Sequence, residues 1–363
     1  RPRRDFQRHS RRGRRSYMHE HSNGQSRMNS LERIKAAIAF APVDRTPAVP
    51  QLFGHTAVLA GVALGDYLRD GGLLARCQIE ALRRYGHDIV FAFMDLCVET
   101  EAVGSVLRYR ENQYPDVASY VLAPAGDASA LAVPDPAVAG RMPELLRAAG
   151  ILRRELDDKV LVAGCVAGPM TLATQLLGIE TALYLAADDP ARFEKILDFS
   201  TAVAIRYGIA QIEAGVHLPI VLDPSASPAV VPPQFFRELL LPRLQRVFAA
   251  FRQAGALANW LNIAGPTETT LPYYPEAGAD IANFDYYVEP QRAQQLLPRT
   301  CLDGNMKSLL FVEASPDEVA AAASRLVSAF ADRGGFLLSS GCEIPPEAKP
   351  ENIAAMVAAC RGG

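Results

Sequence analysis

Short apolar runs alternate with longer segments of helical periodicity along most of the chain. Several of the short runs are apolar at consecutive positions, as in 160–162 and 220–222. Strands that are buried on both faces have this composition, which is typical of a parallel sheet covered by helices. The pattern predicts eight strands, at residues 45–52, 88–94, 159–165, 218–222, 256–263, 280–284, 300–302 and 336–340.

The segments between these runs carry the start and stop signals of helices. We expect the first helix to begin after Asn29, where Glu32 completes a capping box. Pro190 is suited to the first turn of a later helix, and Gly215 is suited to its end. Further helices are predicted at residues 72–85, 138–156, 190–214, 233–254, 316–333 and 351–360.

Eight such alternations predict a single-domain α/β fold, a (β/α)8 TIM barrel over residues 28–363. A doubly wound open sheet is the competing fold. It normally has a GxGxxG turn after its first strand, and the sequence has no such turn there. Alternating positions at 104–123 interrupt the rhythm after the second strand. They predict a β-hairpin insertion beside the mouth of the barrel.

Composition and charge exclude several classes of protein. The formal net charge of -3 gives no overall attraction to nucleic acid or to an acidic membrane. No apolar run reaches the roughly 18 to 20 residues that a membrane span needs. The 6 cysteines form no CxxC pair. We therefore expect reduced thiols and a cytoplasmic protein.

Residues 1–27 differ from the rest of the chain. They are rich in arginine and have almost no apolar side chains, so this basic extension should be disordered. We interpret it as an upstream extension ahead of a start near Met28. A targeting or nucleic-acid-binding arm is the alternative. The segment lacks the apolar region of a secretory signal.

Polar side chains follow the predicted strands, where β/α barrels carry their reactive groups. We expect Asp95, Asp223 and Cys342 to be catalytic. Asp223 could instead cap the next turn, and Cys342 could be inert packing. The expected substrate-binding residues are His55, Glu101, Met170, Asn262, Asp285, Asp303 and Asn305.

Several colinear motifs between residue 28 and the C-terminus belong together. They are Val43-Asp44-Arg45-Thr46-Pro47, Met94-Asp95-Leu96, Gly168-Pro169-Met170-Thr171, 222–227, Gly304-Asn305 and Ser340-Gly341-Cys342-Glu343-Ile344-Pro345-Pro346. This set resembles the uroporphyrinogen decarboxylase superfamily, and most of all its corrinoid (methylcobalamin:coenzyme M-type) methyltransferase branch. The resemblance implies a barrel enzyme that moves a methyl group between a corrinoid or small methylated compound and an acceptor. Methyl-corrinoid would be a co-substrate, and a separate corrinoid protein a possible partner.

The chain differs from this branch in the residues expected to bind the metal ion. The resemblance implies a zinc ion held by a His-x-Cys pair after the fifth strand and by a cysteine after the eighth. Here Asn262 and Ala264 replace the pair, and Cys342 alone matches. A catalytic zinc normally has three protein ligands, so Cys342 would need replacements such as His55. Without zinc to lower the pKa of a thiol acceptor, the chain would use another acceptor or donor, or would have lost the reaction.

Two alternatives remain beside methyl transfer. The decarboxylases of the superfamily bind a polycarboxylate and carry an arginine-bearing loop after the first strand, whereas residues 51–61 contain no arginine or lysine. Asp95 matches the position expected of the decarboxylase aspartate, so a uroporphyrinogen decarboxylase-type carboxy-lyase stays the alternative. A non-catalytic relative that binds a small-molecule ligand is the third hypothesis.

Overall fold

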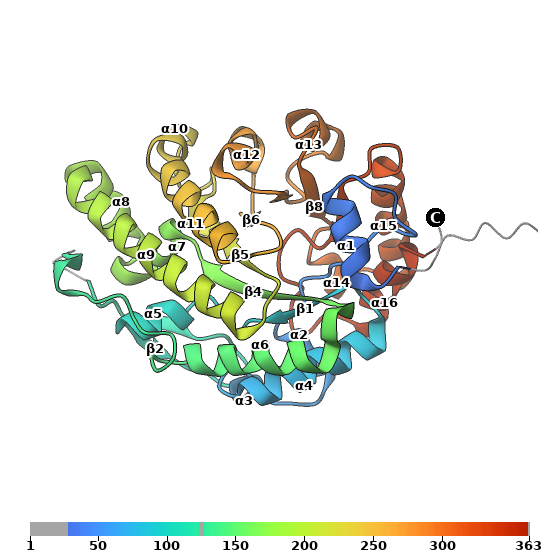
Figure 1. The fold of residues 1–363 in the computed structure, drawn as a ribbon, viewed down its shortest axis with the longest axis horizontal. Coiled ribbons are helices and arrows are strands. Elements are labelled where there is room, and N and C mark those ends of the chain that lie inside the picture. The colour runs from blue at the N-terminus through green and yellow to red at the C-terminus, as the bar shows by residue number, and fades with distance from the viewer. Residues whose placement is uncertain (1–27, 123–126, 362–363) are drawn as a thin grey trace, which may run out of the picture.

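A computed structural model describes residues 28–122 and 127–361, and it shows a curved parallel sheet with helices packed around it (Figure 1). The basic extension at residues 1–27 lies outside the described residues. The sheet has 7 strands in the order β1-β4-β5-β6-β7-β8-β9. Their bounds are β1 Ile89–Ala92, β4 Leu161–Ala167, β5 Leu218–Leu222, β6 Trp260–Asn262, β7 Ile281–Asn283, β8 Cys301–Asn305 and β9 Phe336–Ser339.

The segment predicted as the first strand, residues 45–52, is a strand only in part. It forms one parallel bridge, between Ala48 and Leu338 of β9. The amide of Leu338 donates to the Pro47 carbonyl at 2.9 Å. Pro47 and Pro50 have no N–H to donate, which limits the pairing on both sides of Ala48. Among the described residues, the main sheet therefore has seven regular strands and one short bridging segment, where the sequence predicted eight strands.

Long helices lie on the outer side of the sheet (Figure 1). They are α4 Gly71–Tyr85, α6 Met142–Leu156, α9 Pro190–Ala214, α11 Leu241–Gln253, α15 Pro316–Phe330 and α16 Pro350–Ala359. The shorter helices are α1 Ser30–Ile38, α2 His55–Leu59, α3 Leu64–Tyr67, α5 Val98–Val103, α7 Pro169–Leu177, α8 Ile179–Asp188, α10 Pro233–Phe235, α12 Tyr274–Ala277, α13 Pro290–Leu296 and α14 Leu310–Glu313.

The local helix signals are confirmed where they are strongest. Asn29 and Glu32 form the predicted capping box of α1. Helix α9 begins at Pro190 and ends before Gly215, whose φ of 117° suits a residue without a Cβ. The helix predicted at 233–254 is confirmed over residues 233–253, with a π-helical turn at Phe236–Leu240 between α10 and α11. Pro242 follows this turn, and it lacks the N–H that a continuous α-helix would need.

Two short antiparallel strands, β2 Val106–Arg108 and β3 Asp116–Ser119, pair within the segment where the sequence predicted a hairpin. The register of the pair shifts between Val106 and Leu107. Figure 1 shows β2 beside α5, at the lower left of the view. Residue 123, at the end of the predicted insertion, lies outside the described residues.

Alternate residues of the strands belong to two hydrophobic clusters. Ile89 and Phe91 of β1 belong to an inner cluster that also contains Leu31 and Ile34 of α1. Val90 belongs to a larger cluster that contains the buried faces of the outer helices. This alternation explains the consecutive apolar positions in the strands, because both faces of the sheet are buried. Helix α1 therefore packs on the inner core.

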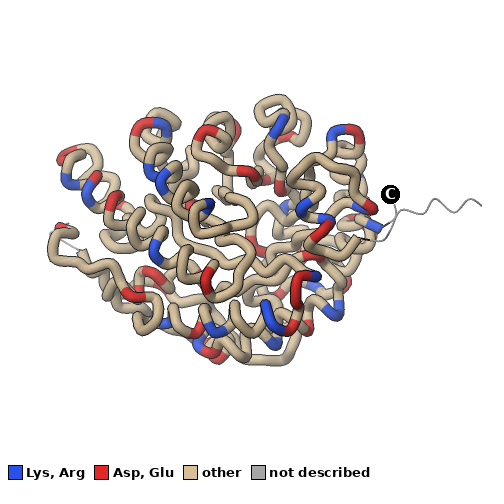
Figure 2. The backbone as a smooth tube through the Cα atoms, in the orientation of Figure 1, with Lys and Arg blue, Asp and Glu red and all other residues tan. Residues whose placement is uncertain are grey.

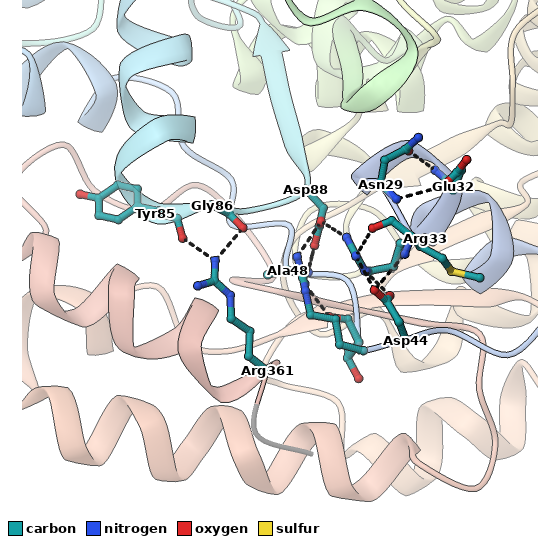
Figure 3. Close-up of polar contacts among 12 residues, drawn as sticks. Asn29, Glu32, Arg33, Asp44, Ala48, Tyr85, Gly86, Asp88 and Arg361 are labelled. Atoms are coloured by element: carbon teal, nitrogen blue, oxygen red, sulfur yellow. Dashed lines mark hydrogen bonds and ion pairs between the residues drawn. The ribbon is translucent and has the colours of Figure 1, made fainter. Parts of the chain in front are cut away.

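A network of charged side chains ties α1 to the start of β1 (Figure 3). Asp88 immediately precedes β1 and accepts hydrogen bonds from Arg33 at 2.7 Å and from Arg45 at 2.8 Å. The amide of Ala48 donates to the same carboxylate at 2.8 Å, and Asp44 binds Arg33 at 2.6 Å. The motif around Arg45 is therefore structural, since it holds the amino ends of the strands.

The surface carries both signs of charge. Lys and Arg alternate with Asp and Glu over the outer helices (Figure 2). In the parts of the chain that the structure describes, no single helix is long and apolar enough to cross a membrane, and the pair α7 and α8 passes that test only together, with a bend of 105°. All 6 cysteines are free, as expected for reduced thiols. The cytoplasmic location stays a prediction.

Candidate functional site

The carboxyl ends of the strands surround a pocket of about 390 Å³. Its walls come from the segments after β1, β5, β6 and β9, from residues 51–53, from the turn between β2 and β3, and from α7. The lining residues are Gln51, Phe53, Phe93, Met94, Asp95, Leu96, Cys97, Tyr114, Pro115, Gln175, Leu222, Pro224, Asn262, Ala264, Cys342 and Glu343. The structure thus brings three of the expected site residues, Asp95, Asn262 and Cys342, to one pocket.

Asp95 lies at the pocket wall in an ion pair with Arg141. The guanidinium donates from Nη1 to Oδ2 at 2.5 Å and from Nη2 to Oδ1 at 3.1 Å. The amide of Cys97 also donates to Oδ1, at 2.8 Å. Burial lowers the pKa of Arg141, but the carboxylates of Asp95 and Glu101 outweigh that effect and raise it. Asp95 is therefore a fixed carboxylate whose charge Arg141 compensates.

Glu101 stands behind this pair and does not line the pocket. It accepts a hydrogen bond from Nε of Arg141 at 2.7 Å and another from the Tyr109 hydroxyl at 3.1 Å. Arg141 also lies over the Tyr109 ring, 5.5 Å from its centroid. Glu101 therefore orients the arginine that holds Asp95, and it has no direct contact with the pocket.

Asp223 is fully buried and lies under the N-terminus of α7. Its carboxylate accepts hydrogen bonds from the Thr171 amide and hydroxyl, both at 2.7 Å, and from the Met170 amide at 3.3 Å. These amides have no partner within the helix, so Asp223 caps α7 from a distant part of the chain. A Cβ on Gly168 would lie 2.3 Å from this carboxylate, so only glycine leaves room for the cap. Burial raises the pKa of Asp223 to about 6, against the effect of the Thr171 hydrogen bonds.

Met170 lies next to Asp223 at the start of α7. It is completely buried, and its amide serves the cap of α7. Neither Met170 nor Asp223 belongs to the pocket lining, although the neighbouring Leu222 and Pro224 do. Both residues shape the pocket wall from behind.

Cys342 offers a thiol to the pocket. Its Sγ lies 3.0 Å from Oγ of Ser308. Burial raises the pKa of the thiol, Ser308 lowers it, and the carboxylates of Asp285 and Glu343 raise it further. The pKa lies above its ordinary value, so the thiol is protonated near neutral pH and is a weak nucleophile.

Glu343 and Tyr114 line the pocket next to Cys342, and sequence reasoning selected neither of them. The Tyr114 hydroxyl donates to Oε1 of Glu343 and accepts from the Gly54 amide at 2.8 Å. Burial raises the pKa of Glu343 to about 7, although the Tyr114 hydrogen bond acts in the other direction. Glu343 could have been found from its position beside Cys342. Tyr114 has no comparable signal, because its approach to the pocket depends on the fold.

His55 is the buried first residue of α2, and both of its ring nitrogens have partners. Nδ1 lies 3.1 Å from the Pro346 carbonyl, and Nε2 lies 2.9 Å from the Tyr85 hydroxyl. Burial lowers the pKa of the imidazole, so it is neutral near pH 7. His55 does not line the pocket with Cys342.

The residues present do not fit the zinc ion that the resemblance implied. No group of three or more His, Cys, Asp or Glu side chains in residues 28–122 and 127–361 has an arrangement that could hold a metal. Asn262 and Ala264 line the pocket where the branch has its His-x-Cys pair, and neither side chain is a zinc ligand of the usual kind. Cys342 is hydrogen bonded to Ser308, and His55 lies elsewhere.

The last three expected residues lie after β7 and on β8, outside the pocket. Asp285 accepts from the amides of Gly265 and Tyr286, both at 2.7 Å, and burial raises its pKa. Asp303 is fully buried, with Asn283 donating to Oδ2 at 3.0 Å. Burial raises its pKa to about 7. Asn305 lines a second pocket of about 360 Å³.

The lining of the first pocket is mostly apolar and aromatic, with two acids and the side-chain amides of Gln51, Gln175 and Asn262. Phe53 and Phe93 meet edge to face, with ring centroids 4.7 Å apart at 70°. The described residues that line this pocket include no lysine, arginine or histidine. Arg141 compensates Asp95 from behind the wall, whereas Glu343 has no ion pair with any described residue. The pocket can therefore hold a small apolar or cationic group, and it is poorly suited to an anion.

Comparisons with known proteins agree with the arrangement of the strands. The family model described as "Uroporphyrinogen decarboxylase (URO-D)" matches residues 29–363. A solved structure of a methyltransferase from Methanosarcina mazei has 25% sequence identity and a TM-score of 0.84. The match covers 92% of this chain and 98% of that one.

Similar curated proteins include two kinds of enzyme. A methylcobamide:CoM methyltransferase MtaA of Methanosarcina barkeri is 28% identical over 335 residues, which cover 90% of this chain and 96% of that protein. A uroporphyrinogen decarboxylase of Paracoccus denitrificans is 30% identical over 313 residues, covering 82% of this chain and 88% of that protein. Identity alone does not separate the two activities.

Proposed function

Because this chain belongs to the uroporphyrinogen decarboxylase (URO-D) family, we propose that it is a methyltransferase-like enzyme. It would move a methyl group between a corrinoid and a small molecule bound in the pocket. Its relatives include methyltransferases and decarboxylases at similar identity, so the pocket must separate the two activities. The observation that carries the proposal is the absence of lysine, arginine and histidine from the described lining of the pocket.

A polycarboxylate substrate would need cationic groups that this pocket does not offer. Transfer of a carboxylate from water to a poorly polar site is costly unless a cation or several donors meet it. The guanidinium of Arg141, behind the pocket wall, is already paired with Asp95 and Glu101. Glu343, whose pKa is raised to about 7, offers an anion no compensating charge. This favours methyl transfer over the carboxy-lyase alternative, because a methyl group needs an apolar site that excludes water.

Three residues would act at the pocket in this proposal. Asp95, fixed by Arg141, would orient the polar part of the substrate, and Asn262 would bind it by hydrogen bonds. Cys342 would contact the substrate as a neutral thiol. Asp223 would act indirectly, since it holds the start of α7. No step is assigned to a zinc ion, because the residues do not fit one.

Methyl-corrinoid would enter as a co-substrate. Since relatives of this chain include a methylcobamide:CoM methyltransferase, we propose that the corrinoid comes free or on a separate corrinoid protein that docks over the carboxyl ends of the strands. We also propose that residues 45–52 complete the sheet as the eighth member of a TIM barrel. The bridge from Ala48 to Leu338 supports this.

Cobalt absorption tests the proposed activity. The purified protein is mixed with methylcobalamin and a panel of thiol acceptors, and in the reverse direction with cobalt(I) cobalamin and small methylated compounds. We expect a spectral change with at least one partner and no release of CO₂ from uroporphyrinogen. Methylcobalamin that stays unchanged with every partner, free or protein-bound, contradicts the proposal. Release of CO₂ from uroporphyrinogen would support the carboxy-lyase instead.

A rebuilt ligand pair tests why the chain does not fit zinc. The double variant Asn262→His, Ala264→Cys places a His-x-Cys pair in the pocket that contains Cys342. We expect the variant to retain about one zinc per chain after dialysis and the wild type to retain much less. The matched control adds Cys342→Ser to the double variant and should lose the metal. Equal zinc in all three proteins would show that the pocket does not bind it.

A further inference from the structure

Two features of the pocket point to the charge of its small-molecule substrate. The first is the aromatic corner made by Phe53 and Phe93. Both side chains line the pocket and are about 4% exposed. Their edge-to-face contact places the two rings at 70°. The face of an aromatic ring carries partial negative charge and attracts cations, most of all where water is excluded.

The second feature is the carboxyl group of Glu343. It lines the same pocket, and Tyr114 fixes it by a hydrogen bond. No lysine, arginine or histidine among the described residues pairs with it, in contrast to Asp95 and its partner Arg141. Glu343 is half-buried, and without a cation beside it burial raises its pKa to about 7, so a cationic ligand would favour the charged form of this carboxyl group.

We propose that the pocket binds a methylated cation, either a quaternary ammonium or a sulfonium ion. Its methyl groups contact the rings of Phe53 and Phe93, and its positive charge is balanced by Glu343. Both kinds of ion share a compact shell of methyl groups around one positive charge. A pocket of about 390 Å³ has room for such an ion.

This inference rests on the proposed methyl transfer for its chemistry, and it agrees with a pocket whose residues do not fit zinc. The electron pair of a cobalt(I) corrinoid attacks one methyl carbon of the cation. The bond from that carbon to nitrogen or sulfur breaks, and its electron pair stays on nitrogen or sulfur. The products are a methyl-cobalt(III) corrinoid and a neutral amine or thioether. The leaving group is neutral, so no metal or base is needed to activate it.

Binding measured by calorimetry in the absence of corrinoid tests the charge preference. The ligands are tetramethylammonium, trimethylsulfonium, choline and 3,3-dimethylbutan-1-ol, a neutral molecule with the shape of choline. We expect choline to bind at least about tenfold more tightly than the neutral alcohol. The first two ligands distinguish ammonium from sulfonium. Equal or tighter binding of the alcohol would overturn the proposal.

Matched variants locate the charge. Glu343→Gln should weaken choline binding about tenfold and leave the alcohol within about twofold. The control Glu347→Gln removes the same charge from an exposed position on the same loop and should not change either affinity. Phe93→Leu should weaken choline more than the alcohol. Thermal unfolding of each variant verifies that it is folded. The proposal is overturned if Glu343→Gln behaves like Glu347→Gln.

The two proposals fail in different ways. Selective cation binding without any methyl transfer to cobalt(I) cobalamin would leave the binding site standing and contradict the proposed activity. Methyl transfer from a neutral donor, together with no preference for cations, would support the activity and overturn the proposed substrate class.

Discussion

At both ends of strand β1 an aspartate pairs with arginine, but the numbers of acidic and basic groups match at only one end. Asp88 precedes the strand and Asp95 follows it, and each carboxylate binds arginine. At the amino end, Arg33 and Arg45 face Asp44 and Asp88, so two cations meet two acids. At the carboxyl end, Arg141 faces Asp95 and Glu101 while Glu343 lines the same pocket, so one cation meets three acids.

The comparison separates a structural end from a functional one. The balanced network around Asp88 has its polar groups paired and joins α1 to the sheet. The pocket end has an excess of acid and a cavity, an arrangement that does not favour stability by itself. Buried ionisable groups without a matching partner are typical of binding and catalytic sites. We therefore expect a ligand to bind at the pocket end and to balance the negative charge of the acids that have no cation.

The largest effect should follow from removing the acid at the balanced end. Asp88→Asn leaves Arg33 and Arg45 without their shared carboxylate in a buried site, and we expect a loss of about 3–5 kcal/mol in the free energy of unfolding. Urea unfolding measures it. The control is Asp116→Asn, which removes an exposed pair with Arg108 and should cost less than about 1 kcal/mol. Similar losses in both variants would break the comparison.

Removal of the cation at the pocket end should lower the free energy of unfolding by less than Asp88→Asn does. Arg141→Gln leaves Asp95 and Glu101 unpaired, but Asp95 borders a cavity that water can enter. We expect a loss of about 2–3 kcal/mol in the free energy of unfolding, measured with urea. The same variant should bind cationic ligands more tightly, since it adds one uncompensated acid to the wall. A loss as large as that of Asp88→Asn would show that the two ends are equivalent.

Asp303 should make the free energy of unfolding depend on pH, with an effect of intermediate size. Burial raises its pKa to about 7 in the folded chain, from an ordinary value near 3.8. The folded chain thus binds this proton more tightly than the unfolded chain, so the stabilisation is full below about pH 4 and is lost as the pH rises through about 7. Asp303→Asn removes this loss. Between pH 5 and pH 8 the free energy of unfolding of the variant should gain on the order of 2 kcal/mol relative to wild type.

Urea unfolding of the two proteins at both pH values provides the check on Asp303. The conservative change keeps the size of the side chain and its contact with Asn283. A difference between variant and wild type that does not depend on pH would mean that Asp303 is charged in the folded chain at both values.

The smallest effect concerns Ser308, which hydrogen bonds to Cys342. Ser308→Ala should cost less than about 1 kcal/mol in stability. The pKa of the Cys342 thiol should rise further, because Ser308 lowers it in the wild type. Alkylation of Cys342 at pH 8 should therefore be about two- to threefold slower, measured by mass spectrometry of the labelled peptide. Faster alkylation would indicate that Ser308 shields the thiol instead.

The regular part of the fold was accessible from the sequence because its signals are local. Strand β5 matches its predicted bounds, and the capping box of α1 was predicted from Asn29 and Glu32. Helix α7 was not predicted, although Pro169 at its first position is a start signal of the kind used for Pro190; its cap, Asp223, lies 52 residues from Thr171. A distant cap of this kind leaves no mark in a local window.

The site was predictable only in outline. The position of Asp95, Asn262 and Cys342 at strand ends was enough to bring them to one pocket. Their partners were not predictable, because Arg141 meets Asp95 across 46 positions of the chain and Tyr114 meets Glu343 across 229. These pairings decide which acids are compensated, and that is why the charge of the pocket required the structure.

The bridge between Ala48 and Leu338 has a consequence for biosynthesis. Arg33, Asp44 and Asp88 emerge from the ribosome early and are near one another in the chain, so their cluster can form while translation continues. The partner of Ala48 emerges only when almost the whole polypeptide has been made. During translation the backbone groups around Ala48 therefore stay unpaired until β9 has been made. The chain is most exposed to aggregation in this interval.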